Sequence, residues 1–218
     1  MTQRALIFAN GEINDGPMVR RALAAAADAI IIAADGGAHA ARRFDLEINL
    51  VIGDMDSLGE AALTTLTASG VEALRHPPEK DETDLELALL WAAQSGIEWI
   101  RIIGALGGRL DQTLSNIFLL ALPQLNGRDV RLVAGIQEAW LCYPGETIID
   151  GASGDTVSLI PLNGAAHGVR TENLYYPLHD ETLTFGPARG VSNVMSTDQA
   201  RVWLRDGVLL LVHTEGRA

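Results

Sequence analysis

The chain has 218 residues, enough for one or two domains, and its 28 acidic and 16 basic residues give a formal net charge of −12. With 48% hydrophobic and 20% charged residues, the composition is that of a globular protein rather than a disordered one. The acidic charge and the lack of a basic cluster argue against a nucleic-acid partner, and a single cysteine excludes an internal disulfide or a zinc site of several thiolates.

No segment of the sequence resembles a signal peptide or a membrane span. The apolar run near the N-terminus ends at Asn10 and is too short for a signal peptide, so it predicts a first strand. The most apolar stretch, residues 22–34, contains Asp28 and is shorter than the roughly 20 residues that a membrane span needs. We therefore expect a cytoplasmic protein with no membrane partner.

Up to residue 135, short β-branched runs alternate with longer segments rich in alanine and leucine. The strongest expected helix has Leu85, Leu89 and Ala92 on one stripe and ends before Gly96. The alternation predicts an α/β domain over residues 1–135, with a mostly parallel sheet. In chain order the expected elements are strand 5–9, helix 17–27, strand 30–32, helix 38–44, strand 50–52, helix 60–68, strand 71–74, helix 81–94, strand 99–103, helix 113–121 and strand 130–134.

After residue 135 the pattern changes to short apolar runs separated by turn signals such as Pro144-Gly145 and Asn163-Gly164. This pattern predicts a small all-β domain over residues 136–218, antiparallel and sandwich-like. The pair Asp206-Gly207, between apolar runs at 202–204 and 208–212, predicts a hairpin near the end of the chain.

Four polar clusters follow the expected strands of the α/β domain. Ligands of open α/β sheets bind beyond the carboxyl ends of the strands, so these clusters are expected to converge. The first cluster is Asp35, Gly36 and Gly37, where two glycines let backbone N–H groups approach an anion at the start of a helix. A tight turn capped by Asp35 explains the same residues without a ligand.

The second cluster contains Asp54, Asp56 and Ser57, directly after strand 50–52. Carboxylates two residues apart in an extended segment point to the same side, and two such oxygen ligands suit Mg²⁺. The alternative is a solvated acidic turn in which Ser57 is the N-cap of the next helix.

The third cluster lies at the start of the strongest helix and contains Lys80, Asp81, Thr83 and Asp84. Asp81 suits an N-cap, and acidic residues favour the first helical turn. Capping explains Asp81 but not Lys80, Thr83 and Asp84 together, which could hold a metal ion and a phosphate.

The fourth cluster is the glycine-rich segment 104–112, which places Arg109 and Asp111 at the start of a helix. The arginine side chain suits phosphate oxygens, and Asp111 could accept a hydrogen bond or orient a nucleophile, although a salt bridge between the two is the simpler interpretation. The segment contains neither a Walker A loop nor a Gly-x-Gly-x-x-Gly motif. Apart from the cap candidate Asp81, the four clusters together place five aspartates, one lysine and one arginine on successive loops, which favours phosphoryl transfer.

Other reactive residue types have simpler explanations. The five histidines lack metal-ligand spacing and are expected at surface or turn positions. Cys142 lies in an apolar run and is expected to be packed.

The four clusters occur in the order seen in thiamine pyrophosphokinases, which the chain resembles through most of its length. Segments 157–161, 174–178 and 189–193 extend the resemblance into the second half. The resemblance implies an α/β catalytic domain that binds ATP and Mg²⁺, and a β-sandwich that binds thiamine. It also implies transfer of the pyrophosphoryl group of ATP to the hydroxyl of thiamine, and a homodimer with the active site at the subunit interface.

The resemblance further implies roles for particular residues. The metal ligands are Asp54, Asp56 and Asp84, and catalysis uses these three with Arg109 and Asp111. The residues at ATP and its phosphates are Asp35, Gly36, Gly37, Lys80, Thr83 and Arg109; those near thiamine are Asp111, Gln112, Ser192 and Asn193.

Two positions depart from the pattern of the family. Gln112 stands where many bacterial members carry histidine. Some members stack a tryptophan of the last strand on the pyrimidine of thiamine, but residues 207–214 contain none, which leaves the stacking partner unassigned.

Two alternative functions remain open from the sequence. A related pyrophosphokinase acting on another alcohol, such as a hydroxymethylpterin, would share the ATP site and differ around Ser192 and Asn193. A thiamine- or nucleotide-binding module without turnover would be expected to lose its metal ligands, and none is missing.

Overall fold

A computed structural model describes residues 3–217 of the chain. The chain forms two compact units that divide between Gly135 and Ile136, and each has a hydrophobic core of its own. No helix in residues 3–217 combines the length and the apolar character that crossing a membrane requires.

The sheet of the first unit contains six parallel strands in the order β6-β5-β1-β2-β3-β4. The chain therefore builds outward from β1 on one side, returns to add β5 on the other side, and adds β6 last. The reversal places a topological switch point between β1 and β5, where α/β sheets bind ligands. The strands are β1 (Arg4–Phe8), β2 (Ile30–Ala34), β3 (Leu50–Gly53), β4 (Glu72–Arg75), β5 (Trp99–Ile103) and β6 (Asp129–Ala134).

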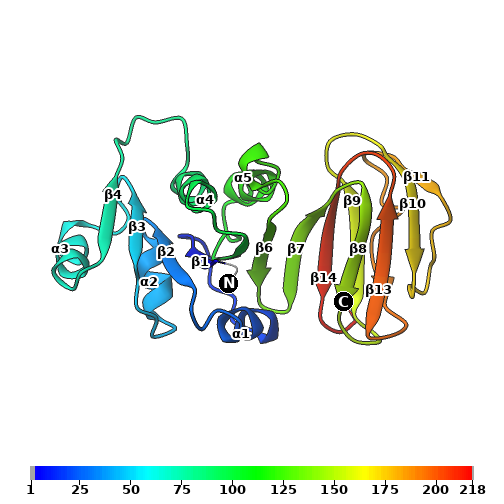
Figure 1. Cartoon of the computed structure of the whole chain (residues 1–218), viewed down its shortest axis with the longest axis horizontal. Helices are drawn as coiled ribbons and strands as arrows, with labels where there is room; N and C mark the ends of the chain where they lie inside the picture. The colour runs from blue at the N-terminus through cyan, green and yellow to red at the C-terminus, as the bar shows by residue number, and fades with distance from the viewer. Residues whose placement is uncertain (1–2, 218) are drawn as a thin grey trace. The chain divides into compact units, whose positions relative to one another are not determined.

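Helices cover both faces of this sheet, so the predicted α/β class is confirmed (Figure 1). Small and branched side chains from α1, α2 and α3 pack with Leu6, Phe8, Ile31 and Val51 in one core cluster. Figure 1 shows α4 and α5 on the other side of the strands. The helices are α1 (Pro17–Ala24), α2 (Gly37–Arg42), α3 (Glu60–Ala68), α4 (Asp84–Gln94), α5 (Leu110–Leu119) and the short 3₁₀ helix η1 (Pro123–Leu125).

The starts of two helices differ from expectation. Helix α4 begins at Asp84 instead of residue 81, because the side chain of Thr83 is the N-cap and accepts a hydrogen bond from the N–H of Glu86 at 3.2 Å. The predicted cap role of Asp81 is therefore wrong. Helix α5 begins at Leu110, three residues before the expected start.

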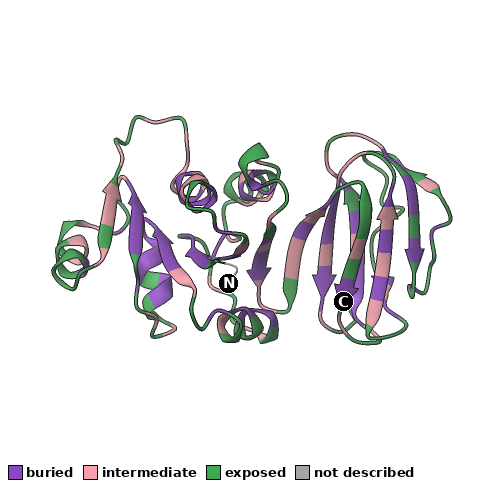
Figure 2. Cartoon of the chain, in the orientation of Figure 1, coloured by how far each residue is buried: buried purple, intermediate pink, exposed green. Residues whose placement is uncertain are grey.

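The second unit is a sandwich of two four-stranded sheets in the orders β12-β9-β14-β7 and β11-β10-β13-β8, with antiparallel pairing throughout. Alternate residues of β13 face the core (Figure 2). Cys142 is buried and packs in the same core, as expected. The strands are β7 (Gln137–Cys142), β8 (Gly145–Asp150), β9 (Thr156–Pro161), β10 (Ala166–Glu172), β11 (Glu181–Leu183), β12 (Asn193–Val194), β13 (Gln199–Leu204) and β14 (Leu209–Thr214).

The hairpin predicted at Asp206-Gly207 is wrong, because β13 and β14 belong to different sheets. Strand β13 pairs with β8 and β10, whereas β14 pairs with β7 and β9. The turn between them carries the chain from one layer of the sandwich to the other. Asp206 instead makes an isolated bridge with His167.

One histidine departs from the expected surface or turn location. His213 is 2% exposed, and its Nε2 lies 2.8 Å from Oδ2 of Asp155. The Asp155 carboxylate also accepts hydrogen bonds from the N–H groups of Ala152 and Gly216. Burial works to raise the pKa of Asp155, but these hydrogen bonds outweigh it and lower that pKa. The pair thus fastens the 152–155 turn to the last strand.

Candidate active site

The parallel register of the first unit brings the four predicted clusters to one edge of its sheet. Phe8 of β1 lies opposite Ala33 of β2 and Ile103 of β5, so these strands end at the same level. Asp35 follows β2, Asp54 follows β3, Lys80 and Asp84 follow β4, and the glycine-rich segment follows β5.

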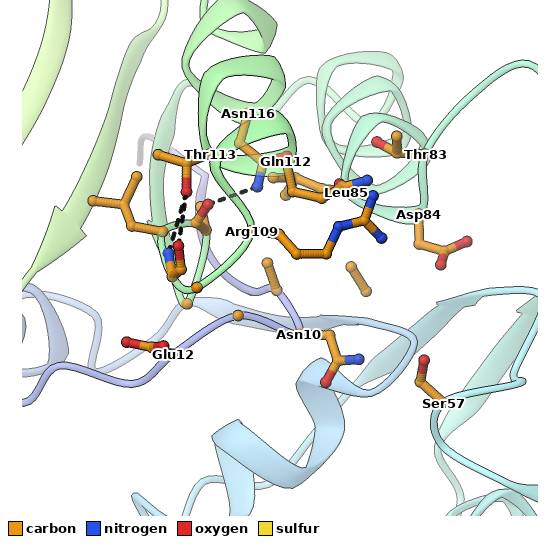
Figure 3. A pocket seen from close by; sticks show the side chains of 18 of the residues that line it. Asn10, Glu12, Ser57, Thr83, Asp84, Leu85, Arg109, Gln112, Thr113 and Asn116 are labelled. Atoms are coloured by element: carbon orange, nitrogen blue, oxygen red, sulfur yellow. Dashed lines mark hydrogen bonds between the residues drawn. The ribbon is translucent and has the colours of Figure 1, made fainter.

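A pocket of about 700 Å³ opens at the switch point between β1 and β5 (Figure 3). Five of the predicted site residues line it: Lys80, Thr83, Asp84, Arg109 and Gln112. Its walls also contain Ser57 of the second cluster, which the sequence suggested only as a helix cap, and four polar residues that were not predicted from the sequence: Asn10, Glu12, Thr113 and Asn116. Asn10 and Glu12 directly follow β1, so the rule applied to the other strand ends would have found them.

Three carboxylates gather at this edge and form what we call the acidic triad: Asp35, Asp54 and Asp84. One carboxylate oxygen from each lies within 4.8 Å of the others. Gly53 makes room for them, because a Cβ at this residue would lie 2.8 Å from Cγ of Asp84 and 3.1 Å from Cβ of Asp35. The fold thus holds three hard oxygen donors where a larger residue would separate them.

Lys80 is the only lysine in the sequence, and it lies against the acidic triad. Its Nζ is 3.0 Å from Oδ2 of Asp54 and 3.1 Å from Oδ1 of Asp84, and the side chain is 10% exposed. Burial works to lower the pKa of Lys80, but its contacts with the two carboxylates outweigh that effect and raise the pKa. The lysine is therefore a charged ammonium that partly neutralises the triad.

The two carboxylates that contact Lys80 differ in their proton affinity. The hydrogen bond from Lys80 lowers the pKa of Asp54, whereas burial, followed by repulsion from Asp54 and Asp35, raises the pKa of Asp84 in spite of the lysine. Oδ1 of Asp84 is buried, and no group in residues 3–217 gives it a hydrogen bond of good geometry. A buried carboxylate oxygen with an unused lone pair suits a bound cation.

Asp35 has a structural task within the triad. It is 2% exposed, and its two oxygens accept hydrogen bonds from the N–H groups of Ser57 at 2.9 Å and Leu58 at 3.0 Å. These bonds fix the loop that follows β3, and with it the position of Asp54. Gly36 and Gly37, predicted at the phosphates, do not line the pocket; Gly37 packs against the Phe8 carbonyl.

Asp56 lies outside the acidic triad. The segment is not extended as expected, because Met55 has a φ of +70° and a buried side chain. Asp56 is exposed, and its Oδ1 accepts a hydrogen bond from the Ser57 hydroxyl at 3.0 Å. The expectation that Asp54 and Asp56 point to the same side of an extended segment is therefore wrong, and the metal role of Asp56 stays a prediction.

The glycine-rich segment is tied to the start of α5. Nδ2 of Asn116 donates to the carbonyl of Ala105 at 2.6 Å, and the Thr113 hydroxyl contacts the backbone of Gly107. Arg109 and Asp111 form the salt bridge that the sequence left as the simpler interpretation, and both are largely exposed. Pairing with Arg109 lowers the pKa of Asp111. Figure 3 shows Arg109 reaching across the pocket toward Asp84.

The remaining predicted residues, Ser192 and Asn193, belong to the second unit. Ser192 is exposed and has a φ of +60°. Asn193 is 7% exposed, and its side chain bonds to the backbone of Tyr176 in both directions. Their predicted place near thiamine stays a prediction.

One family model matches most of each unit. The model described as the catalytic domain of thiamin pyrophosphokinase matches residues 22–132. The model described as the vitamin B1 binding domain of thiamin pyrophosphokinase matches residues 146–209.

Individual proteins give the same result. The thiamine pyrophosphokinase of Bacillus subtilis (strain 168) is 29% identical over 163 residues, which cover 74% of this chain and 76% of that protein. The crystal structure of the thiamine pyrophosphokinase from Bacillus subtilis superposes with a TM-score of 0.87 at 26% identity, covering 98% of this chain and 99% of the other. For the crystal structure of a thiamin pyrophosphokinase family protein from Enterococcus faecalis, the TM-score is 0.85 at 25% identity, with the same coverage.

Proposed function

Because the chain belongs to the thiamin pyrophosphokinase family, we propose that it transfers the pyrophosphoryl group of ATP to the hydroxyl oxygen of thiamine at the pocket beside β1 and β5. In this reaction the thiamine oxygen bonds to the β-phosphorus, and the bond from that phosphorus to the α-phosphate oxygen breaks. The products are thiamine diphosphate and AMP. The observation that carries the placement is the acidic triad, whose Asp84 lines the switch-point pocket together with the chain's only lysine.

The donor set fits Mg²⁺. Asp54 and Asp84 offer carboxylate oxygens, one of them buried without a hydrogen bond of good geometry, and Asp35 adds a third carboxylate. Oxygen ligands from a few carboxylates, completed by water and phosphate, are the usual environment of this ion. When bound, Mg²⁺ would neutralise charge on the phosphate oxygens of ATP.

Cationic side chains of the pocket neutralise the remaining negative charge of the phosphates. The Lys80 ammonium is fixed between Asp54 and Asp84, so a phosphate that approaches the triad also meets this positive charge. The Arg109 guanidinium is exposed and can exchange Asp111 for phosphate oxygens, with which it makes paired hydrogen bonds. Both residues then stabilise the negative charge of the transferred group.

Asp111 and Gln112 occupy the first turn of α5, beside Arg109. Because pairing with Arg109 lowers its pKa, Asp111 is a carboxylate at neutral pH and a weak base. We assign it the task of orienting the thiamine hydroxyl by accepting its hydrogen bond. Gln112 lines the pocket, and its amide can contact the same substrate.

A homodimer is also part of the proposal. Helix α5 carries three large apolar side chains at intervals of four residues, Leu110, Leu114 and Phe118, which are 71%, 46% and 55% exposed. Such a stripe is typical of a surface that another protein covers. Light scattering after gel filtration would give twice the mass of the chain if the dimer forms. The predicted cytoplasmic location stays a prediction.

Single substitutions in the triad test the function and its placement together. Thiamine-dependent AMP formation should fall by about 100-fold or more in Asp54→Asn, because even residues that only support a metal ligand are worth about 10- to 100-fold. Asp56→Asn is the matched comparison from the same loop. If Asp56→Asn lost more AMP-forming activity than Asp54→Asn, Asp56 would be a metal ligand in spite of its place outside the acidic triad, and the assignment of the metal site to that triad would be contradicted.

A further inference from the structure

The pocket beside β1 and β5 has two ends that differ in chemistry. One end holds the acidic triad and the lysine, where the phosphates of ATP are proposed to bind. The other end is formed by Glu12, which follows β1, and by Thr113 of α5 against the glycine-rich segment. Figure 3 shows Glu12 on one side of the pocket and Asp84 and Ser57 on the other. A ligand that fills the pocket therefore meets different groups at its two ends.

The glutamate is fixed against the glycine-rich segment. The N–H of Glu12 donates to the carbonyl of Leu106 at 3.0 Å. A Cβ at Gly107 would lie 2.9 Å from the backbone nitrogen of Glu12 and 3.2 Å from its Cγ, and a Cβ at Gly108 would lie 3.3 Å from its Oε1. The side chain therefore lies along two glycines that both line the pocket, and a larger residue at either position would displace it.

The carboxylate of Glu12 has no partner of its own. The residue is exposed, and within residues 3–217 its side chain makes no hydrogen bond or ion pair. Asp15, an acid of the same loop, is instead paired with Arg20. An ionised carboxylate only accepts hydrogen bonds and repels phosphate oxygens. The part of a ligand that Glu12 binds must therefore carry O–H or N–H donors and no negative charge.

We infer that Glu12 is a specificity residue that binds the ribose hydroxyls of the donor nucleotide, with the nucleoside of ATP at the Glu12 end of the pocket and the phosphates at the acidic triad. This inference rests on the proposed function. The ribose of ATP lies directly beyond the α-phosphate and presents two neighbouring hydroxyls, which match the two oxygens of one carboxylate. An acidic side chain after a strand also binds a ribose hydroxyl in dinucleotide-binding α/β sheets.

Two observations favour the nucleotide over thiamine, whose cationic ring a carboxylate would also attract. The first is that Glu12 and Asp84 are the two acids that line the pocket, and only Glu12 lies apart from the triad. The second is that Asp111, on the exposed first turn of α5, already offers a carboxylate to thiamine in the proposed reaction. Glu12 is therefore the acid of the pocket lining that is left for the nucleoside.

Kinetics with ATP and with 2′,3′-dideoxy-ATP, which lacks both ribose hydroxyls, test the inference. In wild type the KM for the dideoxy nucleotide should exceed that for ATP by about 10- to 100-fold, because hydrogen bonds to a charged group are lost. In Glu12→Ala the KM for ATP should rise by a similar factor, and the two nucleotides should then differ by less than about threefold. Glu12→Gln keeps an acceptor and should lie between wild type and the alanine variant.

Asp15→Asn is the matched control for a lost acid in the same loop. Asp15 does not line the pocket, so this variant should leave the KM for both nucleotides within about twofold of wild type. Calorimetric titration with α,β-methylene-ATP, in which carbon replaces the oxygen of the bond that breaks, gives the nucleotide affinity without turnover. Glu12→Ala should weaken this affinity by the same factor by which it raises the KM for ATP.

The outcomes separate this inference from the proposed function. If wild type forms AMP with thiamine but Glu12→Ala keeps the wild-type KM for ATP, or if wild type uses ATP and the dideoxy nucleotide with equal KM, the inference is overturned and the proposed function stands. A rise in the KM for thiamine alone would also overturn it and assign Glu12 to the cationic ring. If wild type forms no AMP with thiamine, the proposed function fails, and the calorimetric comparison still decides the role of Glu12.

Discussion

At the scale of single residues, the site is unusual in the basic side chain that it contains. Fifteen of the sixteen basic residues are arginines, and the one lysine is Lys80. A compact ammonium can lie between Asp54 and Asp84 within hydrogen-bond distance of both, where a planar guanidinium would need more space. In the absence of a metal ion, Lys80 provides positive charge to carboxylates that would otherwise repel one another.

The pKa of Lys80 can be measured directly because no other lysine gives a signal. After reductive ¹³C-methylation, the lysine resonance should titrate above the usual value of about 10.4, in the direction set by its two carboxylate partners. With a folded-state pKa above the unfolded one, the ion pairs stabilise the fold below the unfolded pKa, and this contribution is lost as the pH rises through the folded pKa. Titration at or below the ordinary value would contradict the contacts of Lys80.

Ionised Asp84 is expected to lower the stability of the metal-free folded protein, although the carboxylate is needed for activity. Its pKa is raised, so the folded protein disfavours the ionised form; stability without metal should therefore increase as the pH falls through that pKa. Asp84→Asn should raise the melting temperature in EDTA at neutral pH and lower turnover by about 100-fold or more. Thermal unfolding and AMP formation measure the two effects. A variant that melts below wild type would show that ionised Asp84 is needed for the fold.

At the scale of elements, the sequence predicted the existence and type of every α-helix and strand of the first unit, but not the short 3₁₀ helix η1. Helix α3 and strand β5 have the predicted ends, because β-branched runs and amphipathic segments alternate clearly there. The start of α4 was missed because Asp81 and Thr83 are both good caps, and only tertiary contacts decide between them. The hairpin between β13 and β14 was wrong because an Asp-Gly turn does not reveal whether its two strands share a sheet.

Because α2 packs closely against β1, alanine substitutions at the neighbouring residues Gly36 and Gly37 are expected to differ sharply in their effect on stability. A Cβ on Gly37 would lie 1.9 Å from the backbone oxygen of Phe8, whereas a Cβ on Gly36 would meet the side chain of Asn10, which is exposed and can move. Gly37→Ala should therefore destabilise the protein by about 1–3 kcal/mol or more, and Gly36→Ala by less. Urea unfolding of the two variants measures the difference, and equal stability would mean that α2 shifts away without cost.

At the scale of the whole molecule, the two units have separate cores built on different patterns. Continuous apolar strands form the parallel sheet of the first unit, and alternating strands such as β13 form the sandwich of the second. This contrast in pattern is why the change of fold class could be predicted from the sequence. Asn10 and Glu12 follow β1 and were within reach of the same strand-end rule, and the strand order then places β1 beside the pocket.

Separate cores predict separate responses to a core substitution. Leu211 is fully buried in the sandwich, so Leu211→Ala should cost about 2–5 kcal/mol and speed amide hydrogen exchange in residues 136–218. Exchange in residues 3–135 should stay close to wild type. Hydrogen exchange followed by mass spectrometry distinguishes the two regions, and an equal increase in both would contradict independent cores.

The central claim, transfer of a pyrophosphoryl group to thiamine, is tested most directly by ³¹P NMR of the wild-type protein with MgATP and thiamine. Pyrophosphoryl transfer predicts loss of the ATP signals with the appearance of AMP and a new diphosphate ester, both dependent on thiamine. Formation of ADP with a phosphate monoester of thiamine would contradict it, because the bond broken would then be the one to the γ-phosphorus.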